Sequence, residues 1–353
     1  MRKFPVLVVA TAVTALATVS VVAMTAKHFL GSTATETSAA APELTTGSVE
    51  ARWPKPGVER QQVAAATSEP APQVAAPQVA PPPAPEKRLA SAKMPCSNPN
   101  ALGVSRTVQI DTTGGPGFGM SQYRDYDFLQ PGEVVLTFDD GPWPVTTPMV
   151  LAALKAECVQ ATFFAIGKHA TWHPEVLKQV IAAGHTVGSH TWSHQNLAHK
   201  SPQESQDEIE KGMSAVTMMA GTPIAPFFRY PQLRQTADLK AYLAKRNVAA
   251  FSIDIDSEDF KIKKPDVLVS STMAKLKKKG KGIILMHDLH KWSATAVPEL
   301  LAQLKANGYK IVHVRPKDML ATLPEYDAQI AAATQPVRSS NARAISAVVQ
   351  TVE

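Results

Sequence analysis

Cysteine is scarce in this sequence of 353 residues, which contains only Cys96 and Cys158. Two cysteines are too few for a disulfide-rich scaffold or for a structural zinc cluster built on thiolates. In an oxidising compartment the pair could form a disulfide that ties the start of the folded region to its first helix. Two separate thiols, with Cys158 in the core, fit the sequence equally well.

Strongly clustered positive charge is lacking too. The formal net charge is +6, and the lysines and arginines are dispersed except in the run 275–281. Lysines in that run suit the last turn of a helix, where the helix dipole favours positive charge. No recognised nucleic-acid-binding motif accompanies them, so we expect no nucleic-acid partner. The H-E-x-x-H signature of zinc peptidases is also absent, which argues against that class of enzyme.

Residues 1–29 are predicted to be a signal peptide or a membrane anchor. The positively charged start "MRKF" precedes an apolar run over residues 5–26, which is long enough to cross a bilayer. Val21 and Ala23 offer a passable cleavage site, so both fates stay open, with the uncleaved anchor slightly favoured. Either fate predicts an exported protein of the periplasm or cell envelope, and the uncleaved form would be tied to the inner membrane.

Two further segments have compositions that do not build a core. Residues 30–95 are rich in proline and alanine and predict a disordered, semi-stiff linker. Residues 326–353 are rich in alanine, serine and glutamine and predict a flexible C-terminal tail. The folded domain is therefore expected at residues 96–325.

Within that domain, strand-like and helix-like patterns alternate, which predicts an α/β fold with a parallel sheet. About seven parallel strands fit either a closed barrel or an open doubly wound sheet. The predicted strands lie at 134–140, 161–167, 185–190, 227–231, 248–256, 282–288 and 309–314. The predicted helices lie at 147–157, 173–184, 201–221, 236–247, 264–280 and 293–308.

Ionisable side chains gather where the predicted strands end. In a barrel the carboxyl ends of the strands converge on one face, which is where catalytic groups sit. Five of the predicted strands contribute to this set, namely the first (Asp139 and Asp140), the third (His190 and His194), the fourth (Arg229), the fifth (Asp254, Asp256 and Asp259) and the sixth (His287).

Part of this set has the composition of a metal centre. His190 and His194 are four residues apart, a spacing that puts both imidazoles on one side of a helical turn. Two histidines and one aspartate with an open fourth position are typical of zinc hydrolases, so we expect one divalent metal, zinc by preference. Of the adjacent Asp139 and Asp140, one could bind the metal while the other acts as a base toward the metal's water.

Five short motifs resemble, in order and spacing, those of the polysaccharide deacetylases, the carbohydrate esterases with nodulation-protein-B homology (family 4). They are "TFDDG" (137–141), "HTWSH" (190–194), "RYPQ" (229–232), "DSEDF" (256–260) and "LMH" (285–287). The resemblance covers about residues 134–316. It implies a distorted (β/α) barrel and metal-dependent removal of N-acetyl groups from a polysaccharide that contains N-acetylglucosamine. Peptidoglycan, chitin-type oligomers and exopolysaccharides are the expected substrates.

The resemblance also implies a role for each matching residue. Asp139 would be the general base, His287 the general acid, Arg229 the residue that orients the base, and Asp259 the residue that tunes the acid. The metal ligands would be Asp140, His190 and His194. The backbone N–H of Gln232 would hold the oxyanion, and Phe260 and Leu285 would line the acetyl pocket.

Two positions depart from the family pattern and keep other functions open. Gln232 stands where the family has tyrosine, and Phe260 stands where it has tryptophan. A backbone donor survives a side-chain change, but the groove wall is altered. The alternatives are an amidase or deacylase acting on a non-sugar amide, and a catalytically silent polymer-binding protein of the envelope.

Overall fold

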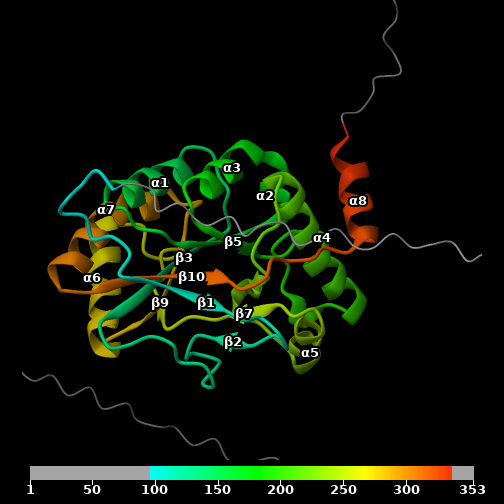
Figure 1. Cartoon of the computed structure of the whole chain (residues 1–353), viewed down its shortest axis with the longest axis horizontal. Helices are drawn as coiled ribbons and strands as arrows, with labels where there is room; N and C mark the ends of the chain where they lie inside the picture. The colour runs from blue at the N-terminus through cyan, green and yellow to red at the C-terminus, as the bar shows by residue number, and fades with distance from the viewer. Residues whose placement is uncertain (1–95, 336–353) are drawn as a thin grey trace, which may run out of the picture. The chain divides into compact units, whose positions relative to one another are not determined.

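The computed structural model describes residues 96–335, which form the coloured part of Figure 1. The predicted export segment 1–29, the predicted linker 30–95 and residues 336–353 lie outside the described residues. Within residues 96–335, none of the helices is both long enough and apolar enough to cross a membrane.

From residue 133 onward, strands and helices alternate largely as predicted, but the described residues contain ten strands and not about seven, because two short strands precede residue 133 and one predicted strand is split. The strands are β1 (Arg106–Ile110), β2 (Gly117–Phe118), β3 (Glu133–Asp139), β4 (Thr162–Ala165), β5 (Thr186–Ser189), β6 (Phe227–Phe228), β7 (Ala249–Phe251), β8 (Ile255–Asp256), β9 (Gly282–His287) and β10 (Lys310–Pro316). The α-helices are α1 (Thr146–Ala156), α2 (Gly167–Trp172), α3 (Pro174–Ala182), α4 (Pro202–Ala220), α5 (Ala237–Lys245), α6 (Pro265–Lys279), α7 (Lys291–Ala306) and α8 (Pro324–Thr334). Two short 3₁₀ segments lie at Leu197–His199 and Pro231–Leu233.

The strands form one parallel sheet, which confirms the predicted α/β class. Its order is β1-β10-β3-β4-β5-β6-β7-β2, and β9 pairs with β3 on the side away from β10, with β8 beyond it. β3 is therefore the central strand, bordered by β9 along its length and by β10 and then β4 on its other edge.

The predicted strand 248–256 is two strands, because the chain changes partners in the middle. Its first part, β7, pairs with β6, and its second part, β8, pairs with β9. Between them the sheet is not closed by strand-to-strand hydrogen bonds. Asp254, in the connecting segment, contacts β9 twice: its backbone N–H donates to the carbonyl oxygen of Ile283 at 2.9 Å, and its carboxylate accepts the Ile283 N–H at 2.7 Å. The barrel is thus distorted at one place, where a single chain segment spans from one pair of strands to the next.

Alternation along β3 divides its side chains between two cores. The side chains of Val134, Leu136 and Phe138 belong to the core between the sheet and the helices. Val135 belongs to a second core inside the curved sheet. Since side chains alternate along a strand, Asp139 points into the same interior as Val135.

The interior core is apolar toward the amino ends of the strands. Phe164, Phe227, Phe251 and Ile283 join Val135 there. Polar side chains follow at the carboxyl ends, and this gradient places the functional groups at one end of the interior.

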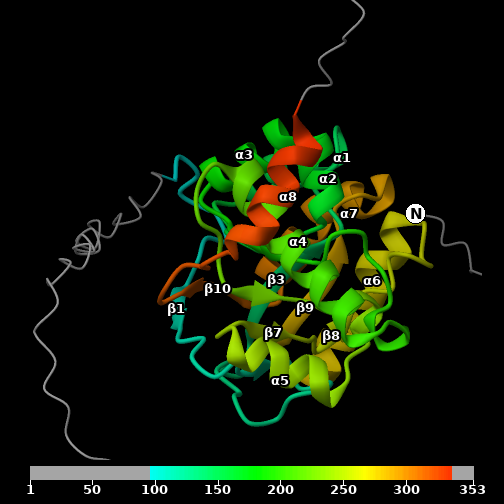
Figure 2. The same cartoon turned by 90° about the vertical axis from the view of Figure 1, so that its right-hand side faces the viewer.

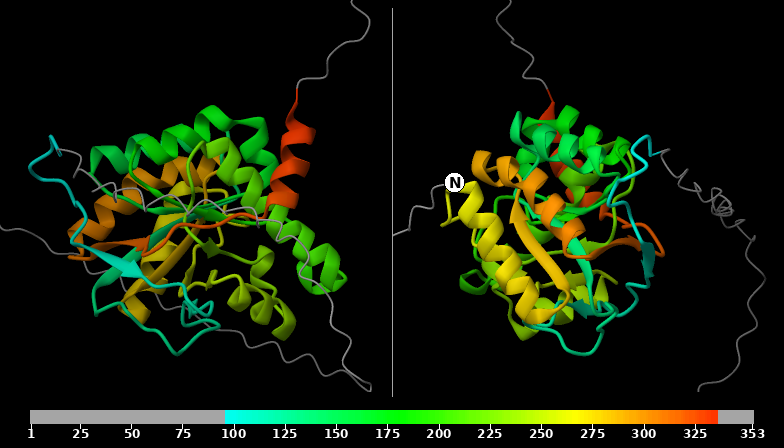
Figure 3. Two further views of the ribbon diagram at one scale, coloured as in Figure 1. Left: turned by 45° about the vertical axis from the view of Figure 1, so that its right-hand side comes forward. Right: turned by 90° about the vertical axis from the view of Figure 1, so that its left-hand side faces the viewer.

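The helices form a layer outside the sheet, in which α6, α7, α1, α3, α4 and α5 pack as successive neighbours. Figure 3 shows α6 and α7 side by side next to β9. The long helix α4 begins at the predicted serine: Ser201 and Glu204 form a reciprocal capping box, and the helix ends at Gly221 in the left-handed conformation.

The N-terminal part of the domain is fastened to both ends of the sheet. β1 lies beside β10, and β2 lies beside β7. Cys96 and Cys158 form a disulfide, so the pairing that the sequence left open is decided in favour of the crosslink.

The predicted flexible tail begins too early. Residues 324–334 form α8, which packs against α4 (Figure 2). Tyr326 and Ile330 are buried there, and the Tyr326 hydroxyl donates to Asp207 at 2.8 Å. The composition, rich in alanine and glutamine, led to the prediction of a flexible tail. Two apolar residues four positions apart are nevertheless sufficient to form the buried face of this helix.

Candidate active site

The two adjacent carboxylates point in different directions because the backbone turns sharply at the end of β3. Asp140 has φ 75°, a left-handed conformation that breaks the strand alternation. The next N–H, from Gly141, donates to the buried Asp288 at 2.9 Å. A side chain at Gly141 would collide with that carboxylate, since an added Cβ would lie 2.3 Å from Asp288 Oδ2. Asp288 therefore fixes the turn that separates Asp139 from Asp140.

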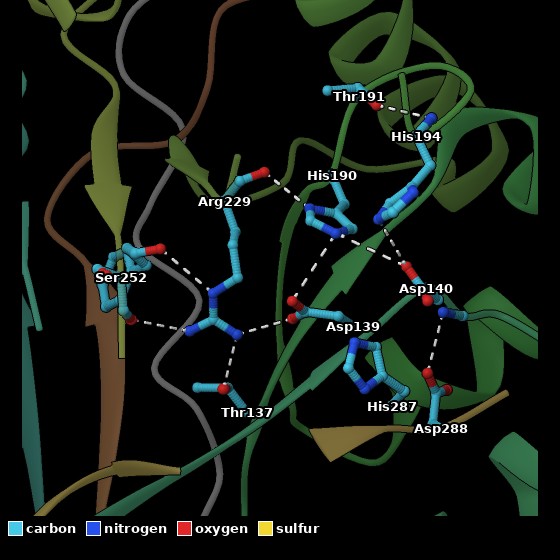
Figure 4. Close-up of polar contacts among 12 residues, drawn as sticks. Thr137, Asp139, Asp140, His190, Thr191, His194, Arg229, Ser252, His287 and Asp288 are labelled. Atoms are coloured by element: carbon cyan, nitrogen blue, oxygen red, sulfur yellow. Dashed lines mark hydrogen bonds and ion pairs between the residues drawn. The ribbon is translucent and has the colours of Figure 1, made fainter. Parts of the chain in front are cut away.

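The three residues predicted as metal ligands lie together. One ligand atom each from Asp140, His190 and His194 lies within 4.8 Å of the others. Asp140 Oδ1 is 3.6 Å from His190 Nε2 and 3.5 Å from His194 Nε2 (Figure 4). The four-residue spacing of the histidines predicted a helical turn, and this prediction is wrong. They lie on an irregular loop after β5, where the Thr191 hydroxyl accepts the His194 N–H at 2.9 Å.

The surroundings of these atoms fit a divalent cation. His190 Nδ1 donates to the carbonyl oxygen of Arg229 at 2.7 Å, which leaves the Nε2 lone pair facing Asp140. Burial, together with the nearby His194, lowers the pKa of His190 well below its usual value, so this imidazole is neutral. Asp140 Oδ1 is buried and has no hydrogen-bond donor among the described residues. A buried carboxylate oxygen without a donor, facing two imidazole nitrogens, is a site that a cation would satisfy.

Arg229 is fully buried and binds Asp139 from inside the sheet. Its Nη1 donates at 2.7 Å both to Asp139 Oδ1 and to the hydroxyl of Thr137. Its Nε and Nη2 donate at 3.2 and 3.1 Å to the carbonyl oxygens of Phe251 and Ser252. Figure 4 shows the Arg229 guanidinium between Ser252 on one side and Thr137 and Asp139 on the other. Burial raises the pKa of Asp139 to about 6, although the positive charge of Arg229 acts in the opposite direction.

His287 lies on β9 beside Asp139, to which it is the register partner. Its Nδ1 donates to Asp259 Oδ1 at 2.6 Å, and its backbone N–H donates to Asp259 Oδ2 at 2.8 Å. The hydroxyl of Ser293 also donates to Asp259 Oδ2, at 2.6 Å. Burial lowers the pKa of His287, but the hydrogen bond and charge of Asp259 outweigh burial and raise it to about 9.

The three predicted substrate-contacting residues differ in exposure. Gln232 has φ 55°, and its backbone N–H finds no acceptor within the described part of the chain. Leu285 is 6% exposed and lies on the same face of β9 as His287. Phe260 is 47% exposed, with its ring centroid 6.2 Å from that of His287.

A cleft of about 370 Å³ adjoins the metal-ligand group. It is lined by Asp140, Ile166, Lys168, His169, Trp172, Ser193, His194 and Leu289. A larger hollow of about 610 Å³ is lined by residues between 108 and 128 and contains none of the predicted site residues. The cleft beside Asp140 is therefore the one that bears on the chemistry.

Three residues that support the site were not predicted from the sequence. Asp288 holds the turn after Asp139, Ser293 holds Asp259, and His169 Nδ1 donates to the carbonyl oxygen of Asp140 at 2.6 Å. Asp288 directly follows His287 in sequence and could have been suspected on that ground. Nothing local to Ser293 or His169 points to these contacts, which depend on the packing of α7 and α2.

Comparisons with known proteins agree with the motifs. The polysaccharide deacetylase family profile matches residues 129–251. A chitooligosaccharide deacetylase of Bradyrhizobium sp. (strain ANU 289) is 36% identical over 155 residues, covering 44% of this chain and 70% of that relative. The chain belongs to the polysaccharide deacetylase family. This confirms the resemblance and the fold that it implied.

Other similar proteins are named as peptidoglycan deacetylases. A peptidoglycan-N-acetylglucosamine deacetylase of Listeria monocytogenes is 33% identical over 184 residues, which are 51% of this chain and 38% of that relative. This chain therefore spans well under half of the Listeria protein. The solved structure of a Bdellovibrio bacteriovorus peptidoglycan deacetylase is similar with a TM-score of 0.55 and 32% identity, covering 60% of this chain and 59% of that one.

Replacing His194 with alanine is expected to weaken Zn²⁺ binding by more than about 100-fold, because one of the three predicted metal ligands is lost. The measurement is a zinc titration in competition with a chromophoric chelator. His199→Ala is the matched control, since His199 is exposed and lies in the same loop region. Equal affinity of His194→Ala and the parent would remove His194 from the ligand group.

Replacing Asp259 with asparagine is expected to lower the pKa of His287 from its value of about 9. The asparagine removes the largest of the charges that favour the imidazolium, while burial, which disfavours it, remains. An NMR titration of the His287 ring in the metal-free protein measures the change. Asp256→Asn serves as control, because the Asp256 carboxylate accepts from the Glu258 N–H in the same loop. An unchanged pKa in Asp259→Asn would contradict the assigned cause.

Proposed function

We propose that this chain is a zinc-dependent hydrolase that removes N-acetyl groups from a cell-envelope polysaccharide containing N-acetylglucosamine. One observation carries the proposal. Two ionisable groups with opposite tasks, Asp139 and His287, lie side by side on β3 and β9, next to a group of three metal-ligating side chains. Membership of the deacetylase family and the names of the relatives support the same reaction class.

Asp139 is the general base in this proposal. Its carboxylate is held on one side by Arg229, and its Oδ2 lies 3.8 Å from His190 Nε2, so it borders the ligand group without belonging to it. A pKa of about 6 leaves it ionised at neutral pH and close to the value that suits proton abstraction from water.

His287 is the general acid. Amide hydrolysis expels a poor leaving group, so the departing nitrogen needs a proton. With a pKa of about 9, His287 holds that proton at neutral pH, and Asp259 keeps Nδ1 occupied so that Nε2 is the atom that delivers it. Both pKa values are raised, and Asp139 keeps the lower of the two, which is the order that a base and an acid require at neutral pH.

Asp140, His190 and His194 would hold the metal, and Gln232 would assist at the carbonyl. A divalent cation bound there supplies Lewis acidity to the attacking water and to the scissile carbonyl. Nitrogen and oxygen ligands of this kind suit zinc. The free N–H of Gln232 is available to the developing oxyanion. Leu285 and Phe260 would line the pocket for the acetyl methyl group.

The proposed location is the periplasm or cell envelope. The Cys96–Cys158 disulfide supports it, because disulfides persist in oxidising compartments. Relatives whose names specify peptidoglycan support it as well. In this proposal residues 1–29 direct export or anchor the chain, and residues 30–95 act as the spacer that lets the domain reach the polymer.

The zinc-loaded protein is expected to release acetate from N-acetylglucosamine oligomers or from peptidoglycan, to stop when zinc is chelated, and to recover when zinc is restored. Asp139→Asn should lower kcat by about 10²–10⁴-fold and keep its zinc, because the base is not a ligand. Asp125→Asn, an exposed aspartate of the larger hollow, is the control.

The other outcomes of that assay point elsewhere. Zinc binding without acetate release from either polymer would favour the non-sugar amide. Neither zinc nor acetate release would favour a polymer-binding protein. Full activity in Asp139→Asn would remove Asp139 as the base.

A further inference from the structure

One wall of the cleft beside the metal-ligand group is built by the short helix α2. Lys168, His169 and Trp172 come from this helix, and Asp140 and His194 line the same cleft. Its volume of about 370 Å³ lies at the lower end of the range of small-ligand sites, about 300–1,000 Å³. The cleft therefore has room for a chemical group next to the one that reacts.

Lys168 is a half-buried cation in this wall. No carboxylate within residues 96–335 pairs with it, whereas the buried Arg229 of the same site binds four acceptors. Its Nζ lies 6.0 Å from the centroid of the Trp192 ring, at the outer limit of a cation–π contact. The ring therefore compensates little of the ammonium charge, and an anion in the cleft would be attracted to it.

Trp172 adds a flat apolar face to the same cleft. The side chain is 57% exposed, which is unusual for a large aromatic group. Its ring lies 5.2 Å from that of His169, and the edge of the Trp143 ring system meets His169 at 5.1 Å. Because His169 also donates to the Asp140 carbonyl, this aromatic wall is joined to a residue of the ligand group. An exposed aromatic face of this kind suits stacking on the face of a sugar.

We propose that this cleft is a subsite for a sugar residue that carries a carboxylate, next to the residue that loses its acetyl group. Lys168 pairs with the carboxylate, and Trp172 covers the sugar ring. The inference rests on the proposed deacetylase function and specifies its substrate as an acidic glycan in preference to a neutral one. The size of the cleft favours a carboxylate borne by the sugar itself over one at the end of an attached peptide.

The test compares three peptide-free substrates at saturating zinc: glycan strands with lactyl ether carboxylates, the same strands after amidation of those carboxylates, and neutral N-acetylglucosamine oligomers. The parent is expected to prefer the first. Lys168→Met should lower kcat/KM on carboxylated strands by about 10–100-fold, as expected for a lost charge-assisted contact. Activity on amidated strands and neutral oligomers should stay within about twofold, and Lys168→Arg should restore the preference.

Lys310→Met is the matched control. Lys310 begins β10 at the amino edge of the sheet, opposite the site, so its loss removes the same charge without affecting the preference. Equal losses on all three substrates in Lys168→Met would overturn the proposal, as would a parent that does not distinguish carboxylated from amidated strands. Strands that still carry their peptides serve as a fourth substrate: if only their turnover depends on Lys168, the carboxylate is the peptide's and the sugar-borne assignment is wrong.

A binding measurement separates this inference from the reaction. In the zinc-loaded Asp139→Asn background, calorimetry should show weaker binding of carboxylated strands when Lys168 is also replaced by methionine. If the parent releases no acetate from any strand, the proposed function fails, but this binding difference still decides whether the subsite exists. Unchanged binding on replacement of Lys168 would refute the subsite.

Discussion

The buried ion pair between Arg229 and Asp139 is the interaction on which the rest of the site depends. Burying a guanidinium and a carboxylate costs several kcal/mol, and only full hydrogen bonding makes the cost tolerable. Arg229 meets this condition with Asp139, Thr137 and two backbone carbonyl oxygens. Those carbonyls, from Phe251 and Ser252, lie at the end of β7, before the chain reaches β8. One side chain thus completes the distorted barrel and orients the proposed base.

The two adjacent carboxylates, Asp139 and Asp140, point in different directions and contact different groups. Alternation along β3 directs Asp139 inward to Arg229, while the left-handed turn at Asp140, fixed by Asp288, directs the second carboxylate toward the histidines. The repulsion between neighbouring charges is relieved because each carboxylate has its own environment. His287, beside Asp139 on β9, completes the set from the third direction, and its partner Asp259 sets its protonation.

The sequence is informative wherever a pattern is local. Short, nearly continuous apolar runs predict β3 and β9, and the Ser-Pro start predicts α4. The split of 248–256 into β7 and β8 could not be predicted, because no glycine or proline interrupts this segment. The change of pairing partner depends on β6 and β9, which are distant in the sequence. The loop that carries His190 and His194 imitates helical spacing without being a helix.

Contacts between residues far apart in the sequence could not be predicted either. The support that Ser293 gives to Asp259 and His169 gives to Asp140 depends on how α7 and α2 pack, which no local motif encodes. The family motifs, in contrast, mark the groups that lie at the carboxyl ends of neighbouring strands. This is why the clustering of Asp140, His190 and His194 could be predicted although the loop conformation could not.

The free energy of unfolding of Arg229→Lys, measured by urea denaturation against the parent, tests the central claim most directly. Lysine keeps the charge but cannot donate to Asp139 and to both carbonyls at once. The expected loss is about 3 kcal/mol, because buried acceptors are left unpaired. Arg124→Lys, at an exposed position, should change stability by less than about 0.5 kcal/mol. If Arg229→Lys were as stable as that control, the barrel and the site would not depend on the guanidinium fork.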